Sequence, residues 1–308
     1  MSTTPSINGS VALTHWGVIR AQGSDAASFL HSQLTNDFTN LGRSQARLAG
    51  YCSAKGRLLA SFVAWKAADD EILLACHASV LPATLKRLSM FVLRAKCKLS
   101  DATAEVPLFG VAGVPARAEE AALPVWGKHD VPGGQWIRLP DGAATRRALL
   151  AGTAPTGESP AITLDDWRWL EVQSGVAVIE SATVEHFVPQ MLNFELVGGV
   201  NFQKGCYPGQ EIVARAQYRG TVKRRTFLFE VDAPALPAQE VFDSAEPHQP
   251  AGMVANAASQ PAGGSTSVLV ELKLAATEGS LHLGAPDGPM LHRRELPYAV
   301  PLEADRAA

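Results

Sequence analysis

Residues 201–220 read NFQKGCYPGQEIVARAQYRG and place Cys206 between Lys204 and a proline-glycine turn. The turn interrupts any preceding helix, whereas apolar side chains recur at helical spacing from Glu211 to Arg219. The positions predicted to face inward are Ile212, Val213 and Ala216. Cys206 is therefore predicted to lie at or just before a helix N-terminus, where backbone N–H groups, the helix dipole and a neighbouring cation favour a thiolate.

Two interpretations of this cysteine remain open from the spacing. In the first, Cys206 is a reactive thiolate, and Glu211 in the first turn also suits the helix dipole. In the second, the thiol is an inert packing residue in a glycine turn. A cysteine-histidine nucleophile pair would need His186 or His15 as its base, and no spacing selects either.

Basic and aromatic residues elsewhere suggest possible ligand contacts. The cations near the end of this segment suit phosphate or a carboxylate tail, or else form a solvated helix face. They are Arg215, Arg219, Lys223, Arg224 and Arg225. Tryptophans offer flat surfaces on which a planar heterocycle can stack, or else belong to the core. They include Trp16, Trp167 and Trp169.

The composition is that of a globular protein. The 308 residues are 46% hydrophobic and 19% charged, with a net charge of −3, which excludes wholesale disorder and argues against a uniformly basic, nucleic-acid-coating surface. The N-terminus lacks signal-peptide character and no run of about 18 apolar residues occurs, so we expect a cytoplasmic protein without a membrane span.

The four cysteines are widely spaced, which predicts free thiols and no metal site. Cys76 ends the apolar run EILLAC and Cys97 lies in RAKCKLS, and both are expected to be strand residues in or near the core; Cys52 is the fourth.

The chain alternates strand and helix patterns before it becomes all-β. A helix is predicted from about residue 24, with Ser24 as N-cap, and a hairpin over 49–65 has Gly56 in its turn. A strand at 71–77, a helix at 81–94 and a strand at 96–102 follow. Residues 101–162 read as a second α+β part. A capping-box pattern at Thr163 and Asp166 predicts the start of another helix. A strand is predicted to restart at 176–179, which reads VAVI. Short β-runs after Arg225 predict a small barrel or sandwich.

The segment KGCYPGQE resembles the signature of the YgfZ-type folate-binding proteins, relatives of the T-protein (aminomethyltransferase) of the glycine cleavage system. The matching residues are Lys204, Gly205, Cys206, Tyr207, Gly209, Gln210 and Glu211. GSDAASFLHSQLTND at 23–37 and SAKGRLLASF at 53–62 are also similar to family motifs. Ser53 stands where the family often has aspartate, and the T-protein has no counterpart of the cysteine signature.

The resemblance implies an α+β, T-protein-like fold with two α+β subdomains around a central channel and a C-terminal antiparallel β-barrel. Its folate-binding core would comprise residues 1–100 and 163–225, the second subdomain 101–162 and the barrel 226–308. It implies tetrahydrofolate as cofactor, with Lys204, Cys206 and Glu211 in catalytic roles. The expected folate contacts are Trp16, Trp167, Tyr207, Gly209, Gln210 and Arg219.

Three functions follow as hypotheses. The first is a folate-dependent accessory protein for the maintenance or repair of iron-sulfur enzymes, including tRNA-modifying ones, with Cys206 as a thiolate. The second is a one-carbon transferase of T-protein type, for which Glu180 and Asp37 are the candidate carboxylates. The third is a non-catalytic RNA-binding or scaffold module that uses the five cations at 215–225.

Overall fold

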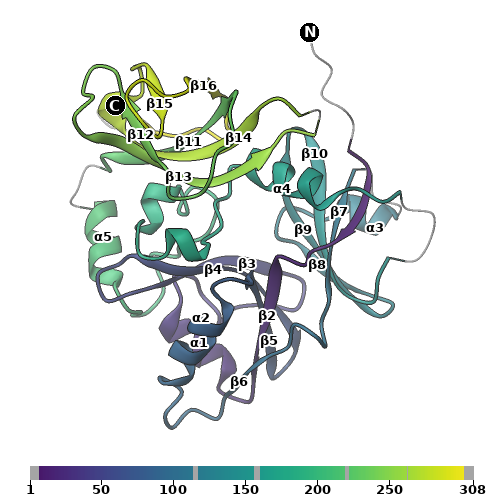
Figure 1. Ribbon diagram of the computed structural model, residues 1–308. Helices are drawn as coiled ribbons and strands as arrows, with labels where there is room; N and C mark the ends of the chain where they lie inside the picture. The colour runs from purple at the N-terminus through teal and green to yellow at the C-terminus, as the bar shows by residue number, and fades with distance from the viewer. Residues whose placement is uncertain (1–6, 114–116, 156–159, 219–221, 262, 302–308) are drawn as a thin grey trace.

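Three antiparallel sheets form the framework of the protein (Figure 1). The structure is a computed structural model that describes residues 7–113, 117–155, 160–218, 222–261 and 263–301. Helices are few and short, the longest being α4 (Leu164–Gln173). The mixed α/β class expected from the sequence is confirmed. No helix in the described ranges is both long and apolar enough to cross a lipid bilayer.

The first sheet has the strand order β3-β4-β5-β2-β6, and the helices α1 (Ala26–Gln33) and α2 (Leu81–Ser89) pack against it. Its strands are β2 (Trp16–Gln22), β3 (Ala46–Cys52), β4 (Leu58–Ala68), β5 (Glu71–His77) and β6 (Lys98–Asp101). The β3–β4 hairpin is confirmed, and Gly56 adopts φ +70° in its turn. The predicted N-cap is wrong by one residue: Asp25 holds that position, and its carboxylate accepts the Lys96 N–H at 2.7 Å.

The second sheet has the order β1-β7-β10-β9-β8. It comprises β1 (Gly9–Ala12), β7 (Leu108–Ala112), β8 (Lys128–Val131), β9 (Gly134–Gly142) and β10 (Thr145–Gly152), with the short α3 (Ala118–Ala122) beside it. Strand β1 pairs with β7, so this sheet includes an N-terminal strand that lies outside the predicted 101–162 segment.

Residues 163–218 connect the sheets. Thr163 and Asp166 form the predicted capping box at the start of α4. The VAVI segment is an irregular chain rather than the expected strand, because Val178 and Ile179 give their N–H groups to Asn256 and Ser61 side chains instead of to a neighbouring strand. The 3₁₀ turns η1 (Ser181–Thr183) and η2 (Pro189–Leu192) and helix α5 (Gln210–Tyr218) follow.

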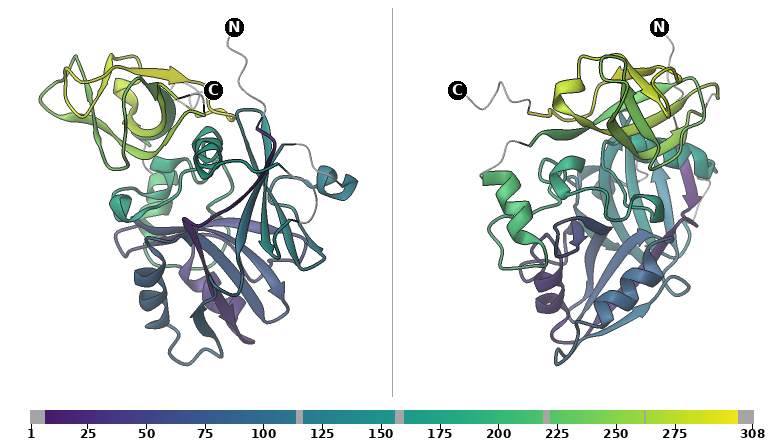
Figure 2. Two further views of the ribbon diagram at one scale, coloured as in Figure 1. Left: turned by 45° about the vertical axis from the view of Figure 1, so that its right-hand side comes forward. Right: turned by 60° about the vertical axis from the view of Figure 1, so that its left-hand side comes forward.

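The third sheet contains only C-terminal strands, in the order β15-β12-β13-β14-β11-β16. They are β11 (Arg224–Val231), β12 (Glu240–Asp243), β13 (Pro250–Ser259), β14 (Thr266–Lys273), β15 (Leu281–Leu283) and β16 (Leu291–Arg294), and the 3₁₀ turn η3 (Leu274–Ala276) follows β14. The sheet curls until its edges meet at the isolated bridge His282–Met290. In the described chain this bridge alone joins the two edge strands, so the predicted small barrel is observed as a curled sheet whose closure is not confirmed. Figure 2 shows this sheet at the opposite end of the molecule from α1 and α2.

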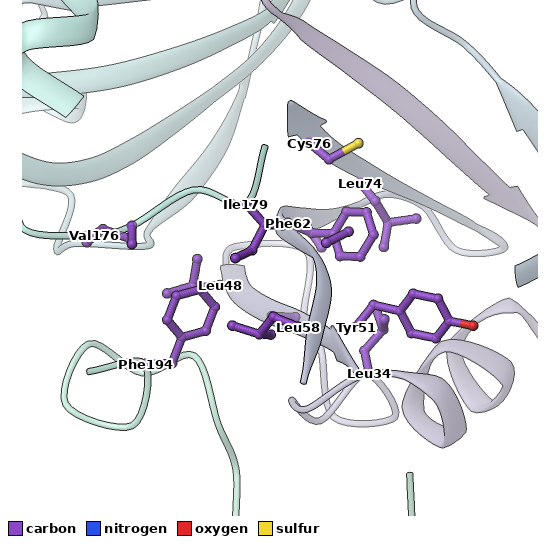
Figure 3. Packing of buried hydrophobic residues seen from close by; sticks show 14 of the residues in the cluster. Leu34, Leu48, Tyr51, Leu58, Phe62, Leu74, Cys76, Val176, Ile179 and Phe194 are labelled. Carbon is purple, nitrogen blue, oxygen red and sulfur yellow. The ribbon is translucent and has the colours of Figure 1, made fainter. Parts of the chain in front are cut away.

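The largest apolar core lies between the first sheet and the connecting segment (Figure 3). Leu48, Leu58 and Phe62 of the β3–β4 hairpin face Ile179 and Phe194 from the 163–218 region. Cys52 and Cys76 are buried in this core as expected for Cys76, and Cys97 is half-buried. Burial therefore joins the N-terminal sheet to residues more than 100 positions later in the chain.

Candidate functional site

Glu171 is the centre of a buried hydrogen-bond cluster between the first two sheets. One carboxylate oxygen, Oε1, accepts from the indole nitrogens of Trp16 and Trp167, each at 2.9 Å. The other, Oε2, lies 3.0 Å from Nε2 of His15. Trp167 and Glu171 are four residues apart on α4 and so share one helix face, while Trp16 begins β2.

The charge of Glu171 is compensated inside the protein. Burial raises the pKa of Glu171, but the His15 hydrogen bond and charge, the Arg147 charge and the Trp167 hydrogen bond outweigh burial and leave the pKa below its ordinary value. The guanidinium of Arg147 lies 5.0 Å from the Trp167 ring centroid. Burial lowers the pKa of Arg147 to about 10, so it stays cationic at neutral pH.

A cavity of about 270 Å³ opens beside this cluster. Trp16, His15 and Glu171 form one wall, and Glu180, His77 and Arg168 add ionisable groups. The third sheet supplies the rest of the lining, through Asn256 and Ala257 of β13 and through Ala235, Leu236 and Pro237 in the loop between β11 and β12. The cavity therefore requires both the N-terminal sheet and the C-terminal one.

A smaller cavity, about 30 Å³, is also lined by Trp16 and Glu171, together with Arg147, Trp126 and Ser61. The two cavities share Trp16, Glu171, Val176 and Val178. Two buried nitrogens of lining residues, Nδ1 of His15 and Nη1 of Arg147, have no hydrogen-bond partner within the described chain. A bound ligand or water at the cavities could satisfy these two nitrogens.

Two titratable groups of the larger cavity have pKa values that depart from their ordinary ranges. Burial, with the nearby charge of His15, lowers the pKa of His77 from 6.5 to about 4. Burial and the charge of Glu171 raise the pKa of Glu180, although Asn256 donates a hydrogen bond to its carboxylate at 2.9 Å. His77 is therefore neutral at neutral pH, and Glu180 holds a proton more readily than an exposed glutamate.

We expect stability to fall as the pH decreases from about 6.5 to about 4. The unfolded chain protonates His77 near pH 6.5, whereas the folded protein does so only near pH 4, so the unfolded state binds more protons in this window. The contribution of His77 to the free energy of unfolding should drop by roughly 2–3 kcal/mol across it. Urea unfolding of the wild type and His77→Asn at several pH values measures this. Equal pH dependence in both proteins would contradict the assignment to His77.

The signature residues lie elsewhere. Lys204 is buried, and its ammonium donates to the backbone oxygens of His31 and Leu34, the latter at 2.7 Å, at the C-terminal end of α1. The ammonium lies 4.7 Å from the Tyr207 ring centroid. Burial lowers the pKa of Lys204 to about 8, against the opposing charges of Asp37 and Cys206. Lys204 thus joins the signature segment to α1.

Cys206 is exposed, and α5 begins at Gln210, four residues later. The helix dipole falls off within the first turn, so it acts less on Cys206 than the sequence predicted. Gln210 and Glu211 form the first turn of α5, where Glu211 is exposed. Ile212, predicted to face inward, is 42% exposed, whereas Val213 is buried.

A histidine and an aspartate lie beside the signature. Nδ1 of His31 is 2.8 Å from Oδ1 of Asp37, and Nε2 lies 3.5 Å from where a β-carbon on Gly205 would stand. Burial raises the pKa of Asp37, but hydrogen bonds from Asn40, Thr39 and His31 outweigh it and hold the pKa well below its ordinary range. Asp37 is therefore a fixed anion that orients His31 next to the residue preceding Cys206.

The glycine of the signature fits against the hairpin turn. Gly209 adopts φ +79°, and a β-carbon there would lie 2.4 Å from the Ser53 carbonyl oxygen and 2.6 Å from Cα of Gly56. We expect Gly209→Ala to lower the free energy of unfolding by roughly 2–4 kcal/mol, because both the backbone conformation and the contact forbid a side chain. Chemical denaturation measures it, with Gly42→Ala as control, where no atom lies within 4 Å. Equal stability of the two variants would contradict this explanation.

The structure separates the predicted site residues into two groups. Trp16 lines both cavities, but of the signature residues, all within the described range 160–218, none lines either one. Trp167 is fully buried and supports Glu171 rather than offering an open ring face. Glu180 lines the larger cavity, whereas Asp37 binds His31. His15 bonds Glu171, and His186 is an exposed residue whose backbone oxygen accepts from Arg57, so neither is hydrogen-bonded to Cys206 in the described chain.

The cations predicted to contact a polyanion also divide. Arg225 is 1% exposed and pairs with Glu195, and Arg224 pairs with Glu271. These two guanidinium groups are structural, because each is committed to a buried carboxylate. Arg215 and Lys223 are exposed, and Arg219 lies outside the described residues.

The sequence reasoning missed several residues of the two sites. They are His15 as a Glu171 partner, His31, His77, Arg147 and Glu171 itself. The four-residue spacing of Trp167 and Glu171 on a predicted helix was an available signal for Glu171. His77 and Arg147 lie on strands of different sheets, and no local pattern relates them.

Comparison with known proteins bears on this arrangement. Residues 7–126 match the family described as GCVT N-terminal domain. Glycine cleavage system aminomethyltransferase T from Bartonella henselae has the same fold, with a TM-score of 0.75 over 96% of this chain and 87% of that one, at 16% identity. The tRNA-modifying protein YgfZ of Klebsiella pneumoniae (strain 342) is 31% identical over 245 residues, which are 74% of this chain and 73% of that protein. The resemblance of the KGCYPGQE segment is thereby confirmed, and this chain belongs to the YgfZ family of proteins related to GcvT.

Proposed function

We propose that this protein binds a reduced folate in the cavity beside Trp16 and serves as an accessory protein in tRNA modification, through support of iron-sulfur enzymes. The observation that carries the proposal is a cavity whose walls combine an indole ring, two carboxylates and an unpartnered buried histidine nitrogen. The name of the Klebsiella relative supports the link to tRNA.

The lining residues fit the chemistry of a pterin. A pterin is flat and has N–H donors beside acceptors on one edge, and Trp16, Glu180 and Asn256 supply a ring surface, an acceptor and an amide. The glutamate tail of a folate is anionic, and Arg168, with a side chain 45% exposed, lies at the same cavity. At about 270 Å³ the cavity suits the pterin ring, which leaves the tail to extend toward solvent. A bound folate would supply one-carbon chemistry.

Tetrahydrofolate titration with tryptophan fluorescence tests the binding site. Trp16→Leu should weaken binding about tenfold or more, because it removes the ring surface and one donor to Glu171. Trp169→Phe is the matched control, since the Trp169 indole donates to Ser267 and does not line either cavity among the described residues. Unchanged affinity in Trp16→Leu, or an equal loss in Trp169→Phe, would refute the site.

In this proposal Cys206 forms a second functional site, at the surface. The exposed thiol adjoins Gly205, against which Asp37 orients the His31 imidazole. A histidine in this arrangement can accept a thiol proton directly or through one water. The rate of iodoacetamide alkylation of Cys206 at pH 7 tests the role: His31→Gln should slow it several-fold, and His248→Gln, on an exposed loop, should leave it unchanged. Identical alkylation rates in all three proteins would refute an activated thiol.

One observation favours a second candidate, a one-carbon transferase of T-protein type. Glu180 lines the folate-sized cavity with a raised pKa, as a proton-transfer group at a folate would require. Turnover of methylene-tetrahydrofolate with an amine donor that survives Cys206→Ala but is lost in Glu180→Gln would support this function over the accessory one. Absence of turnover in the wild type would oppose it.

A further inference from the structure

A strongly basic and partly apolar surface occupies residues 86–98, at the end of α2 and the start of β6. Between His77 and Asp101 the sequence carries five cations and no carboxylate. All five are exposed: Lys86, Arg87, Arg94, Lys96 and Lys98. Within the described chain none of them forms an ion pair with a carboxylate, although Arg87 interacts with the Tyr51 hydroxyl. In a protein with a net charge of −3, this concentration of unpaired cations is local.

The same surface exposes large apolar side chains. Met90 is 59% exposed, Phe91 44% and Leu93 86%. Leu93 also has φ +42°, a left-handed conformation that leucine rarely adopts. Helix α2 ends at Ser89, so these residues form a turn that projects them from the sheet. Apolar side chains exposed together, one of them in an unfavourable backbone conformation, are typical of a contact site.

The nearby carboxylates do not neutralise this surface. Asp25 accepts the backbone N–H of Lys96, and Asp101 accepts from the backbone and hydroxyl of Thr103. The helix α2 lies at the opposite end of the molecule from the C-terminal sheet (Figures 1 and 2), and the larger cavity is partly lined by that sheet. In the part of the chain that the structure describes, no residue of 86–98 lines either cavity at Trp16.

We propose that the 86–98 surface binds RNA at an unpaired loop or end, an inference that rests on the proposed role in tRNA modification. Lysine and arginine side chains at this density suit consecutive phosphates, and they make binding depend on salt. An exposed aromatic ring between cations, as Phe91 is between Arg87 and Arg94, suits stacking of an unpaired base. This surface replaces the cations at 215–225 as the RNA contact, because Arg224 and Arg225 are committed to carboxylates.

Binding of bulk tRNA, measured by fluorescence anisotropy between 50 and 200 mM salt, tests the proposal. The triple variant Lys86→Gln, Arg94→Gln, Lys96→Gln should lower the slope of log affinity against log salt by about two, since each lost single-strand phosphate contact removes about 0.7. Phe91→Ala should weaken binding about tenfold and leave the salt slope unchanged.

The matched control removes the same charge from another face. Lys55→Gln, Arg215→Gln, Lys223→Gln neutralises three exposed cations outside the 86–98 surface and should retain the wild-type slope. A slope that falls equally in both triple variants, or only in the control, would overturn the proposal. So would wild-type protein that binds anionic phospholipid vesicles but not tRNA.

Tetrahydrofolate titration of the same variants separates this inference from the proposed folate site. Tetrahydrofolate should quench the tryptophan fluorescence of the 86–98 triple variant as it does that of the wild type. This result would also show that the variant is folded. A protein that binds tRNA through this surface but shows no folate binding would refute the proposed cofactor and leave the RNA contact standing. A protein that binds folate but not tRNA would refute the RNA contact alone.

Discussion

Glu171→Ala is expected to lower the free energy of unfolding by about 3–5 kcal/mol, an effect typical of breaking a buried ionic cluster. The variant removes the acceptor for the Trp16 and Trp167 indoles and the partner of His15. It also removes the anion that compensates the buried Arg147 cation. Each of these groups would remain buried without its partner, and the loss of compensation accounts for most of the cost.

Urea unfolding at pH 7 measures the effect of Glu171→Ala. Glu171→Gln keeps an acceptor oxygen and nearly the same volume, so we expect a clearly smaller loss. Glu119→Ala, at an exposed position in α3, serves as the surface control and should stay within about 0.5 kcal/mol of the wild type. A loss below about 1 kcal/mol in Glu171→Ala would mean that the cluster does not hold the two sheets together. Folate binding should be lost in this variant as well, because Trp16 is no longer oriented.

Arg225→Ala should also destabilise the protein by about 3–5 kcal/mol. The guanidinium is 1% exposed, pairs with Glu195 and donates to the Gln190 backbone oxygen at 3.1 Å. Its removal takes the cation from a carboxylate whose side chain is only 6% exposed, and it leaves a cavity between η2 and β11. The expected loss is large because a buried ion pair, a buried hydrogen bond and the packing of the Arg225 side chain are lost together.

The control for this prediction is Arg215→Ala in the neighbouring exposed stretch, which should change stability by no more than about 0.5 kcal/mol. Thermal or urea unfolding of the two variants side by side gives the comparison. Similar small effects in both would show that Arg225 has no structural role, and Arg225 would again be a candidate RNA contact, as the sequence predicted. A large effect confined to Arg225→Ala would establish that its role is structural.

Local sequence patterns predicted the secondary structure well where one interaction decides it. The capping box at Thr163 and Asp166 forms between residues three positions apart, and the hairpin turn at Gly56 also spans only a few residues. Each feature is therefore decided by neighbouring residues in the sequence. The errors occur where a distant partner intervenes. Residues 176–179 have strand composition, but side chains of Asn256 and Ser61 take their N–H groups.

The position of the cysteine illustrates the same limit. The sequence predicted that Lys204 stabilises a thiolate at a helix N-terminus. In the structure its ammonium donates to backbone oxygens at the end of α1, and α5 begins only at Gln210. The sequence predicted both Trp16 and Trp167 as folate contacts, but of these two only Trp16 lines a cavity, because α4 places Trp167 in the core. Local spacing predicts on which face of a helix or strand a residue lies. It does not predict which other segment packs against that face.

By itself the sequence determined the family, the mixed α/β class, the signature cysteine and the need for glycine in the turns, since each depends on residues adjacent in the chain. Only the tertiary structure decided that the cysteine and the tryptophan cavity are separate sites. It also brought Glu171 together with His15, Trp16 and Arg147, which come from two distant parts of the chain. The physical reason is that burial and charge compensation depend on which segments come together. Those contacts join residues up to 156 positions apart, beyond the range of any local pattern.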